Sequence, residues 1–462
     1  MAITSRAHAP AAGGTAPVAP PRRGTAFAEG AERVRRAATT EPGRLRIVGA
    51  VLAALAVLFG VAAGWEVSDR TAAAEDVVGR SQPLAAGAAS IYRSLADADA
   101  AASSGFLTGG QEPRELRERY EKDIATASRL LVEAAADAGE DAGDDDAGSR
   151  REIALLGEQL PRYAGLVEQA RATDRQGLPL GGAYLRYANE QMSTLLLPAA
   201  QRLYEAETRR LHEDHDDARA WPPAALVAGL AALGALGWAQ RREYRRTHRV
   251  FNPGLVAATA ATAVALLWLA VGHGVARAEL GEARSGGQES LKVLDAARVA
   301  ALQARADENL TMISRGAVQA ADRKSDKYEV DFARNMDALD SGLAAALRLA
   351  DDEAGRAPLR RAAAGVQQWK ERHAQAREAD LKGDYESALP KVIGGRDSSG
   401  ASFDVVDASL EQAVTHEQAE FTEVARGGLA ALTGLVPGTV ALTLTAAAAA
   451  LLGIGRRLSE YR

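Results

Sequence analysis

Hydrophobic residues gather in four charge-free stretches, each long enough to cross a membrane. A bilayer core needs about 20 apolar residues in helical form. A soluble globular protein is therefore the poorer interpretation of this pattern. The predicted transmembrane helices are residues 47–65, 222–240, 254–275 and 428–455.

The two long segments between these spans, residues 66–221 and 276–427, carry apolar residues at helical spacing. Their apolar positions recur at alternate steps of three and four, which is typical of helices that bury one face. Each segment contains four such stripes, and neither shows the alternation typical of strands. The run Ser103-Ser104-Gly105 and the pair Gly109-Gly110 are expected to break the first stripe. The predicted fold class is all-α, with four transmembrane helices and two extracytoplasmic antiparallel four-helix bundles.

Charge is divided unevenly between the short and the long segments. The head (1–46), the connector (241–253) and the tail (456–462) together hold 16 basic and 5 acidic residues. The two long segments hold 39 basic and 56 acidic residues. Short basic flanks stay in the cytoplasm. We therefore expect a multi-pass protein of the cell membrane with both termini and the connector in the cytoplasm, and the head, rich in Ala, Pro, Gly and Arg, as a disordered tail.

Residues arranged for catalysis are missing from the sequence. The chain has no cysteine, and it lacks a Gly-rich phosphate loop, a zinc-protease motif and a Gly-x-Ser-x-Gly elbow. The charged run from His212 to Asp217 fits a solvated helix better than a metal site. His373 lies beside Trp369 on an apolar stripe and is interpreted as a hydrogen-bonded core residue. We expect no enzymatic activity, no cofactor, no metal and no nucleic-acid partner.

One helix of the second long segment places polar residues on its inward face. At about 100° per residue these residues lie within about 60° of Leu302. Burying such groups is costly unless they are paired. One interpretation is an internal network with acids such as Asp337 or Asp340, and the other is a polar site in which an arginine holds a ligand carboxylate. The candidate ligand-binding residues are Asp295, Arg298, Arg305 and Asn309.

The connector contains a dense group of arginines. One interpretation is contact with an acidic surface of a cytoplasmic partner. The other is that they determine topology and attract anionic lipid. The residues concerned are Arg241, Arg242, Arg245, Arg246 and Arg249.

Two short stretches, Ala304–Gly316 and Gly453–Arg462, together with the four-span, two-bundle layout, resemble the GlnX-like membrane proteins of actinobacteria. The resemblance implies an amino-acid sensing relay. In such a relay an extracytoplasmic glutamine- or glutamate-binding lipoprotein reports its ligand to the membrane protein. That protein in turn signals to the soluble serine/threonine kinase called protein kinase G.

These observations lead to one functional hypothesis and one alternative. The hypothesis is a non-enzymatic signalling protein in which a docked partner or ligand changes the packing of the bundles. The alternative is a cell-envelope protein whose bundles bind other surface components without signalling. A transporter is disfavoured because His273 is the sole titratable residue within the spans. Whether the chain forms a homo-oligomer stays open.

Overall fold

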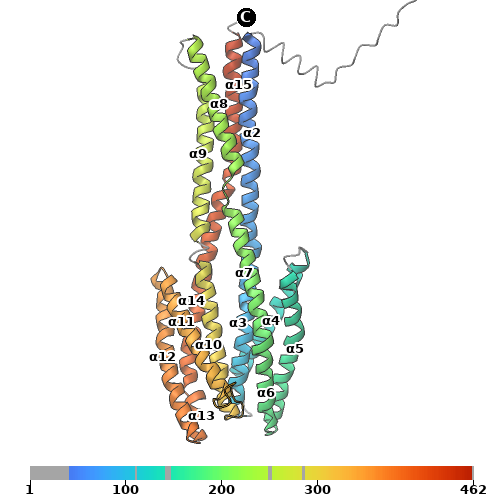
Figure 1. Ribbon diagram of the computed structural model, residues 1–462, viewed down its shortest axis with the longest axis vertical. Helices are drawn as coiled ribbons and strands as arrows, with labels where there is room; N and C mark the ends of the chain where they lie inside the picture. Colours follow the sequence, from blue (N-terminus) through green and yellow to red (C-terminus); the bar gives the residue numbers. More distant parts are fainter. Residues whose placement is uncertain (1–40, 110–111, 141–146, 248–251, 283–286, 460–462) are drawn as a thin grey trace, which may run out of the picture. The chain divides into compact units, whose positions relative to one another are not determined.

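The structure, a computed structural model, describes most of the chain and is helical (Figure 1). No strand occurs in the described residues, and one isolated bridge joins Gln319 to Asp326. The predicted tail up to residue 40 and the acidic stretch 141–146 fall outside them. The described ranges are 41–109, 112–140, 147–247, 252–282 and 287–459.

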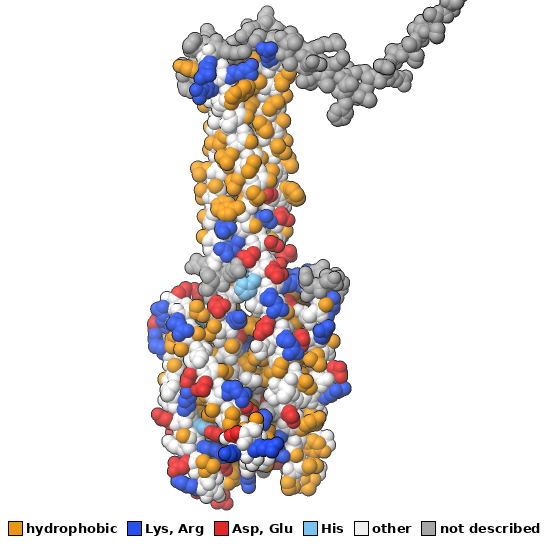
Figure 2. All heavy atoms as spheres, in the orientation of Figure 1, with side chains coloured by type: hydrophobic (Ala, Val, Ile, Leu, Met, Phe, Trp, Pro, Cys, Tyr) orange, Lys and Arg blue, Asp and Glu red, His pale blue; other side chains and the backbone are white. Residues whose placement is uncertain are grey.

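The all-α prediction with four membrane-spanning helices is confirmed. Four helical stretches are long and apolar enough to cross a membrane: residues 43–107, 180–245, 253–281 and 399–456. Figure 2 shows hydrophobic side chains and few charges on the middle of the spans, whereas charged side chains of both signs are scattered over the bundles. The spans are formed by α2 (Glu41–Asp76), α8 (Pro223–Thr247), α9 (Pro253–Glu282) and α15 (Leu435–Ser459).

The chain divides into two compact units, which are described separately. The smaller unit contains one end of each span (residues up to 59, 227–264 and from 442). Small residues permit close helix contact here, as is usual between helices in lipid. A Cβ atom at Gly254 would lie 2.3 Å from the Cα atom of Gly453. The Asn252 side chain donates to the Gly453 carbonyl oxygen at 3.1 Å.

The larger unit (60–226 and 265–441) contains two bundles. In the first bundle, α3 packs on α4, α4 on α5, α5 on α6 and α7, and α7 on α3. The expected break at Ser103-Ser104-Gly105 is wrong: α3 continues through this run, where both serines are buried and hydrogen-bonded to Asn309. The helix ends at Leu107, shortly before Gly109, whose φ of 65° is left-handed. The first bundle consists of η1 (Val77–Ser81), α3 (Gln82–Leu107), α4 (Arg114–Glu140), α5 (Ala147–Arg175), α6 (Leu180–Gln191), η3 (Met192–Leu196) and α7 (Leu197–Arg219).

The second bundle repeats the arrangement, with α10 on α11, α11 on α12, α12 on α14 and α14 on α10. Side-chain caps start its helices: Asp326 accepts from two backbone N–H groups of α11, and Ser398 accepts from the Ala401 N–H of α14. A short helix, α13, which the sequence pattern did not predict, lies between α12 and α14. The second bundle consists of α10 (Glu289–Ser314), α11 (Lys327–Leu349), α12 (Glu353–Leu381), α13 (Tyr385–Ile393) and α14 (Ser399–Thr433).

The two bundles share one continuous hydrophobic core. Helix α3 of the first bundle packs along α10 of the second, and α13 also touches α3. Leu95 and Leu302, both fully buried, belong to this common core. We call the contact region between the bundles the seam.

Candidate ligand site between the bundles

The four candidate residues of α10 all face the seam or its immediate surroundings. Asp295, 2% exposed, is paired with Arg93 of α3. The sequence suggested Asp337 or Asp340 as partners for the arginines of α10. Within the described residues neither acid pairs with Arg298 or Arg305, and Asp340 instead pairs with Lys370. Asp295 and Asn309 have partners in the other bundle, which the sequence pattern alone could not reveal, whereas Arg298 and Arg305 pair within their own bundle.

A chain of ion pairs crosses the seam beside Asp295. Arg298 Nε donates to Asp407 Oδ1 of α14 at 2.8 Å. The other carboxylate oxygen of Asp407 accepts from Arg119 of α4 at 2.6 Å, and Arg119 also binds Asp97 of α3 at 2.7 Å. These charges lie mostly out of water, where Coulomb interactions are strong. The chain therefore links four helices, α3, α4, α10 and α14, from both bundles.

Asn309 binds the first bundle without using charge. Its side-chain amide donates to Ser103 Oγ at 3.0 Å and to Ser104 Oγ at 2.8 Å. Its own oxygen is buried and accepts no hydrogen bond within the described residues. Ser104 also lines the cavity described below, so Asn309 supports one wall of it.

Arg305 is held by a buried network of the second bundle. Its Nη1 donates to Glu308 Oε2 at 2.6 Å. The Trp369 indole N–H donates to the same oxygen at 3.1 Å, and His373 Nδ1 lies 3.0 Å from the other oxygen. The second ring nitrogen of His373 lies 3.2 Å from Glu329. His373 is thus a paired core residue, as its position beside Trp369 indicated.

The network keeps its members ionised although they are buried. Burial alone would raise the pKa of Glu308, but the hydrogen bond with His373 and the Arg305 charge outweigh it and lower that pKa to about 2. Burial alone would lower the pKa of His373, but the hydrogen bonds with Glu308 and Glu329 raise it to about 9. Glu308 therefore holds the Arg305 guanidinium in place through a charge-assisted hydrogen bond.

A cavity of about 380 Å³ lies in the seam next to Arg305, and we call it the seam pocket. A Cβ atom at Gly400 would lie 2.8 Å from Arg305 Nη2 and 2.8 Å from the Val392 carbonyl oxygen, so glycine gives Arg305 room at this wall. Arg396 is exposed and makes no ion pair within the described parts of the chain. The charged and hydroxyl residues of the lining are Asp97, Ser104, Thr108, Arg119, Arg305, Arg396, Ser398 and Asp404.

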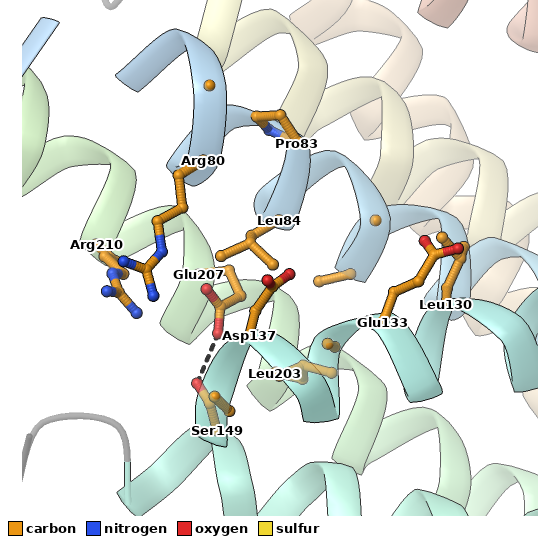
Figure 3. Close-up of a pocket in the computed structure, with 15 residues that line it drawn as sticks. Arg80, Pro83, Leu84, Leu130, Glu133, Asp137, Ser149, Leu203, Glu207 and Arg210 are labelled. Atoms are coloured by element: carbon orange, nitrogen blue, oxygen red, sulfur yellow. Dashed lines mark hydrogen bonds between the residues drawn. The ribbon is translucent and has the colours of Figure 1, made fainter. Parts of the chain in front are cut away.

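A second cavity, of about 160 Å³, lies within the first bundle (Figure 3). Figure 3 shows Arg80 and Arg210 on one side of it and Glu133 on the other. Ser149 Oγ donates to Glu207 Oε1 at 2.7 Å in its wall. Small-molecule pockets usually enclose about 300–1,000 Å³. The seam pocket reaches this size and the second cavity does not, so the seam pocket is the better candidate for a ligand.

The connector arginines follow the end of α8. Arg241, Arg242 and Arg245 belong to its last turns, and the Arg242 guanidinium lies 5.2 Å from the centre of the Trp238 ring. The side chain of Arg246 and the whole of Arg249 lie outside the described residues. The interpretation of these arginines as a partner contact stays a prediction.

Residues 73–216 match the family described as an actinobacterial sensor domain. The match covers the first bundle from η1 to most of α7. No curated protein and no solved structure shows significant similarity to the chain. Together with the four apolar helices, the match supports a sensing role for a multi-pass membrane protein of actinobacterial type.

Proposed function

We propose that the protein is a non-enzymatic transmembrane sensor that relays the availability of glutamate- or glutamine-type amino acids. In this proposal a solute-binding lipoprotein delivers the amino acid outside the cell, and a cytoplasmic serine/threonine kinase receives the signal. The observation that carries the proposal is the seam pocket, in which a fixed arginine faces a cavity of suitable size between two bundles.

The lining of the seam pocket suits a zwitterion. Arg305 and Arg396 offer guanidinium donors for carboxylate groups. Asp404 and Asp97 offer carboxylates for an ammonium group, and Ser398 and Thr108 add hydroxyls. An amino acid with a second polar group would use both kinds of partner, whereas an uncharged ligand would leave them unpaired.

The position of the pocket also suits a relay. Its walls come from α3 and α4 of the first bundle and from α10 and α14 of the second. Helix α3 continues through η1 into α2, and α14 leads to α15 with a break at Gly434. A ligand that binds two packings of the seam unequally shifts the balance between them. Coupling of this kind typically amounts to about 1–3 kcal/mol.

The same proposal assigns the cytoplasmic side by charge. With both termini and the connector in the cytoplasm, the arginines from Arg241 to Arg249 face the kinase. Substituting the five connector arginines by glutamine is expected to abolish co-purification of a serine/threonine kinase with the full-length protein. If no kinase co-purifies with the unaltered protein, this result would favour the cell-envelope alternative.

The ligand site is tested by filling the pocket. Ala401 lines it in the first turn of α14, so Ala401→Phe is expected to block it. Ala408 lies two turns further along the same helix and is exposed, so Ala408→Phe is the matched control. Glutamate or glutamine is expected to raise the melting temperature of the wild type and of the control, because a ligand stabilises the state that it binds.

The two variants separate the outcomes of this experiment. Loss of the ligand-induced shift in Ala401→Phe alone supports the pocket. An equal shift in both folded variants would move the binding site elsewhere. No shift in the wild type with either amino acid would contradict the proposed ligand class.

A further inference from the structure

An open, positively charged groove lies where α7, α9 and α10 meet, at the bundle end of the spans. Its volume is about 820 Å³. His212 and Arg219 come from α7, Arg277 comes from α9, and Glu289 is the single acidic residue among the described side chains of the lining. We call it the Arg219–Arg277 groove, and it is separate from the seam pocket.

The two arginines of the groove lack acidic partners. Arg277 Nη1 donates to the Arg219 carbonyl oxygen at 2.8 Å, which holds both residues together. Arg219 Nε is buried and has no hydrogen-bond partner among the described residues. Neither guanidinium forms an ion pair with any residue that the structure describes. Two adjacent cations with free donors are a ready site for an anion.

The helix faces of the groove leave space beside these cations. Gly274, Ala278 and Gly281 follow one another on one face of α9, and all three line the groove. A Cβ atom at Gly281 would lie 3.0 Å from Arg219 Nη2, so glycine lets that guanidinium lie against the helix.

The groove lies at the depth of lipid head groups. The charge-free run of α9 ends at Ala276, so Arg277 is the first charged residue at this end of the apolar span. Trp221, 44% exposed, packs beside it, with the Arg277 guanidinium 5.8 Å from its ring centre. Tryptophan is enriched at this boundary of membranes. Val271 and Val275 lie before Arg277 in the apolar part of α9. Their side chains are exposed and offer an apolar surface for acyl chains.

We propose that the Arg219–Arg277 groove binds the phosphate of an anionic phospholipid head group, with the acyl chains along α9. Charge, depth and the adjoining apolar surface all match this ligand class. The bound lipid would join the end of α7 to α9 at the point where the apolar span of α9 ends. It would thereby stabilise the point where the first bundle meets a span.

Native mass spectrometry of the full-length protein in detergent tests the proposal. Phosphatidylglycerol is compared with phosphatidylcholine of the same acyl chains. We expect phosphatidylglycerol to bind on the order of tenfold more tightly, since charge-assisted hydrogen bonds are strong and specific. The Arg219→Gln/Arg277→Gln variant is expected to lose this preference. Arg209→Gln/Arg426→Gln is the control with the same charge change, because both residues are exposed and neither lines the groove.

Two further measurements keep the result decisive. Circular dichroism establishes that each variant is helical and folded before lipid is added. Unchanged preference for phosphatidylglycerol in folded Arg219→Gln/Arg277→Gln would overturn the proposal. Competition with inorganic phosphate forms the last arm, in which displacement of the lipid by phosphate at equal concentration would assign the groove to free anions rather than to lipid.

Discussion

The two bundles share an architecture but stabilise buried charge in different ways. In the first bundle, Asp99 is buried with neutral partners only, the Tyr163 hydroxyl at 3.0 Å and the Asn189 amide at 2.6 Å. Burial raises the pKa of Asp99 to about 6. In the second bundle, Glu308 is equally buried, but Arg305 and His373 lower its pKa to about 2.

This difference shows that two bundles with the same helix arrangement can shift the pKa of a buried acid in opposite directions. Burial in the first bundle shifts its acid toward the protonated form, whereas two cationic side chains keep the acid of the second bundle ionised. Arg305, a member of the ionised network, also lines the seam pocket, whereas Asp99 does not. A buried charged side chain beside a cavity needs an oppositely charged partner. In the second bundle Glu308 is this partner for Arg305.

The largest expected effect is on the ionised network. Arg305→Met leaves Glu308 buried without one of its two cationic partners, and breaking a buried pair costs about 3–5 kcal/mol. The matched control is Arg360→Met, which removes a surface pair with Glu353 and is expected to cost little, because water screens exposed charges. Denaturant unfolding followed by circular dichroism measures both. An equal loss of unfolding free energy in both variants would contradict the claim that the buried network stabilises the fold more than a surface ion pair does.

An intermediate effect is expected for His373→Gln, and it depends on pH. Because the folded-state pKa of His373 is raised to about 9, its charge stabilises the fold fully below about pH 6.5, and this contribution is lost as the pH rises through 9. We expect a loss of about 2 kcal/mol at pH 6 and a smaller one above pH 9. A loss of the same size at both pH values would contradict the ionised network.

The smallest effect, of opposite sign, is expected in the first bundle. The raised pKa of Asp99 means that the protonated acid stabilises the fold below about pH 4, and this contribution is lost as the pH rises through 6. Asp99→Asn is therefore expected to increase stability at pH 7.5 by about 1–2 kcal/mol. Asp337→Asn, an exposed control, is expected to change nothing. Destabilisation by Asp99→Asn at pH 7.5 would remove the contrast between the bundles.

The sequence predicted the parts of the fold that depend on local periodicity. Charge-free runs located the spans, and three-and-four spacing indicated the bundle helices, since both signals lie within one helix. The inward face of α10 could likewise be predicted, because Asp295, Arg305 and Asn309 share it. His373 was recognisable from its place beside Trp369.

The rest depended on contacts between distant segments. Asp295 pairs with Arg93, which lies 202 positions earlier, so no local pattern could identify it. Ser103 and Ser104 looked like a helix break because serine competes for backbone hydrogen bonds, but their contact with Asn309 favours the helix. Helix α13 is only 9 residues long, too short for a reliable periodic signal.

The central claim, that ligand in the seam pocket changes the packing of the bundles, is open to a direct distance measurement. The chain has no cysteine, so spin labels can be placed on cysteines introduced at Val132 of α4 and Leu381 of α12, which are 71% and 72% exposed. Double electron–electron resonance of the full-length protein would then report the distance between the bundles. The account predicts that glutamate or glutamine shifts this distribution in the wild-type background and in Ala408→Phe, but not in Ala401→Phe. An identical distribution with and without saturating amino acid would contradict it.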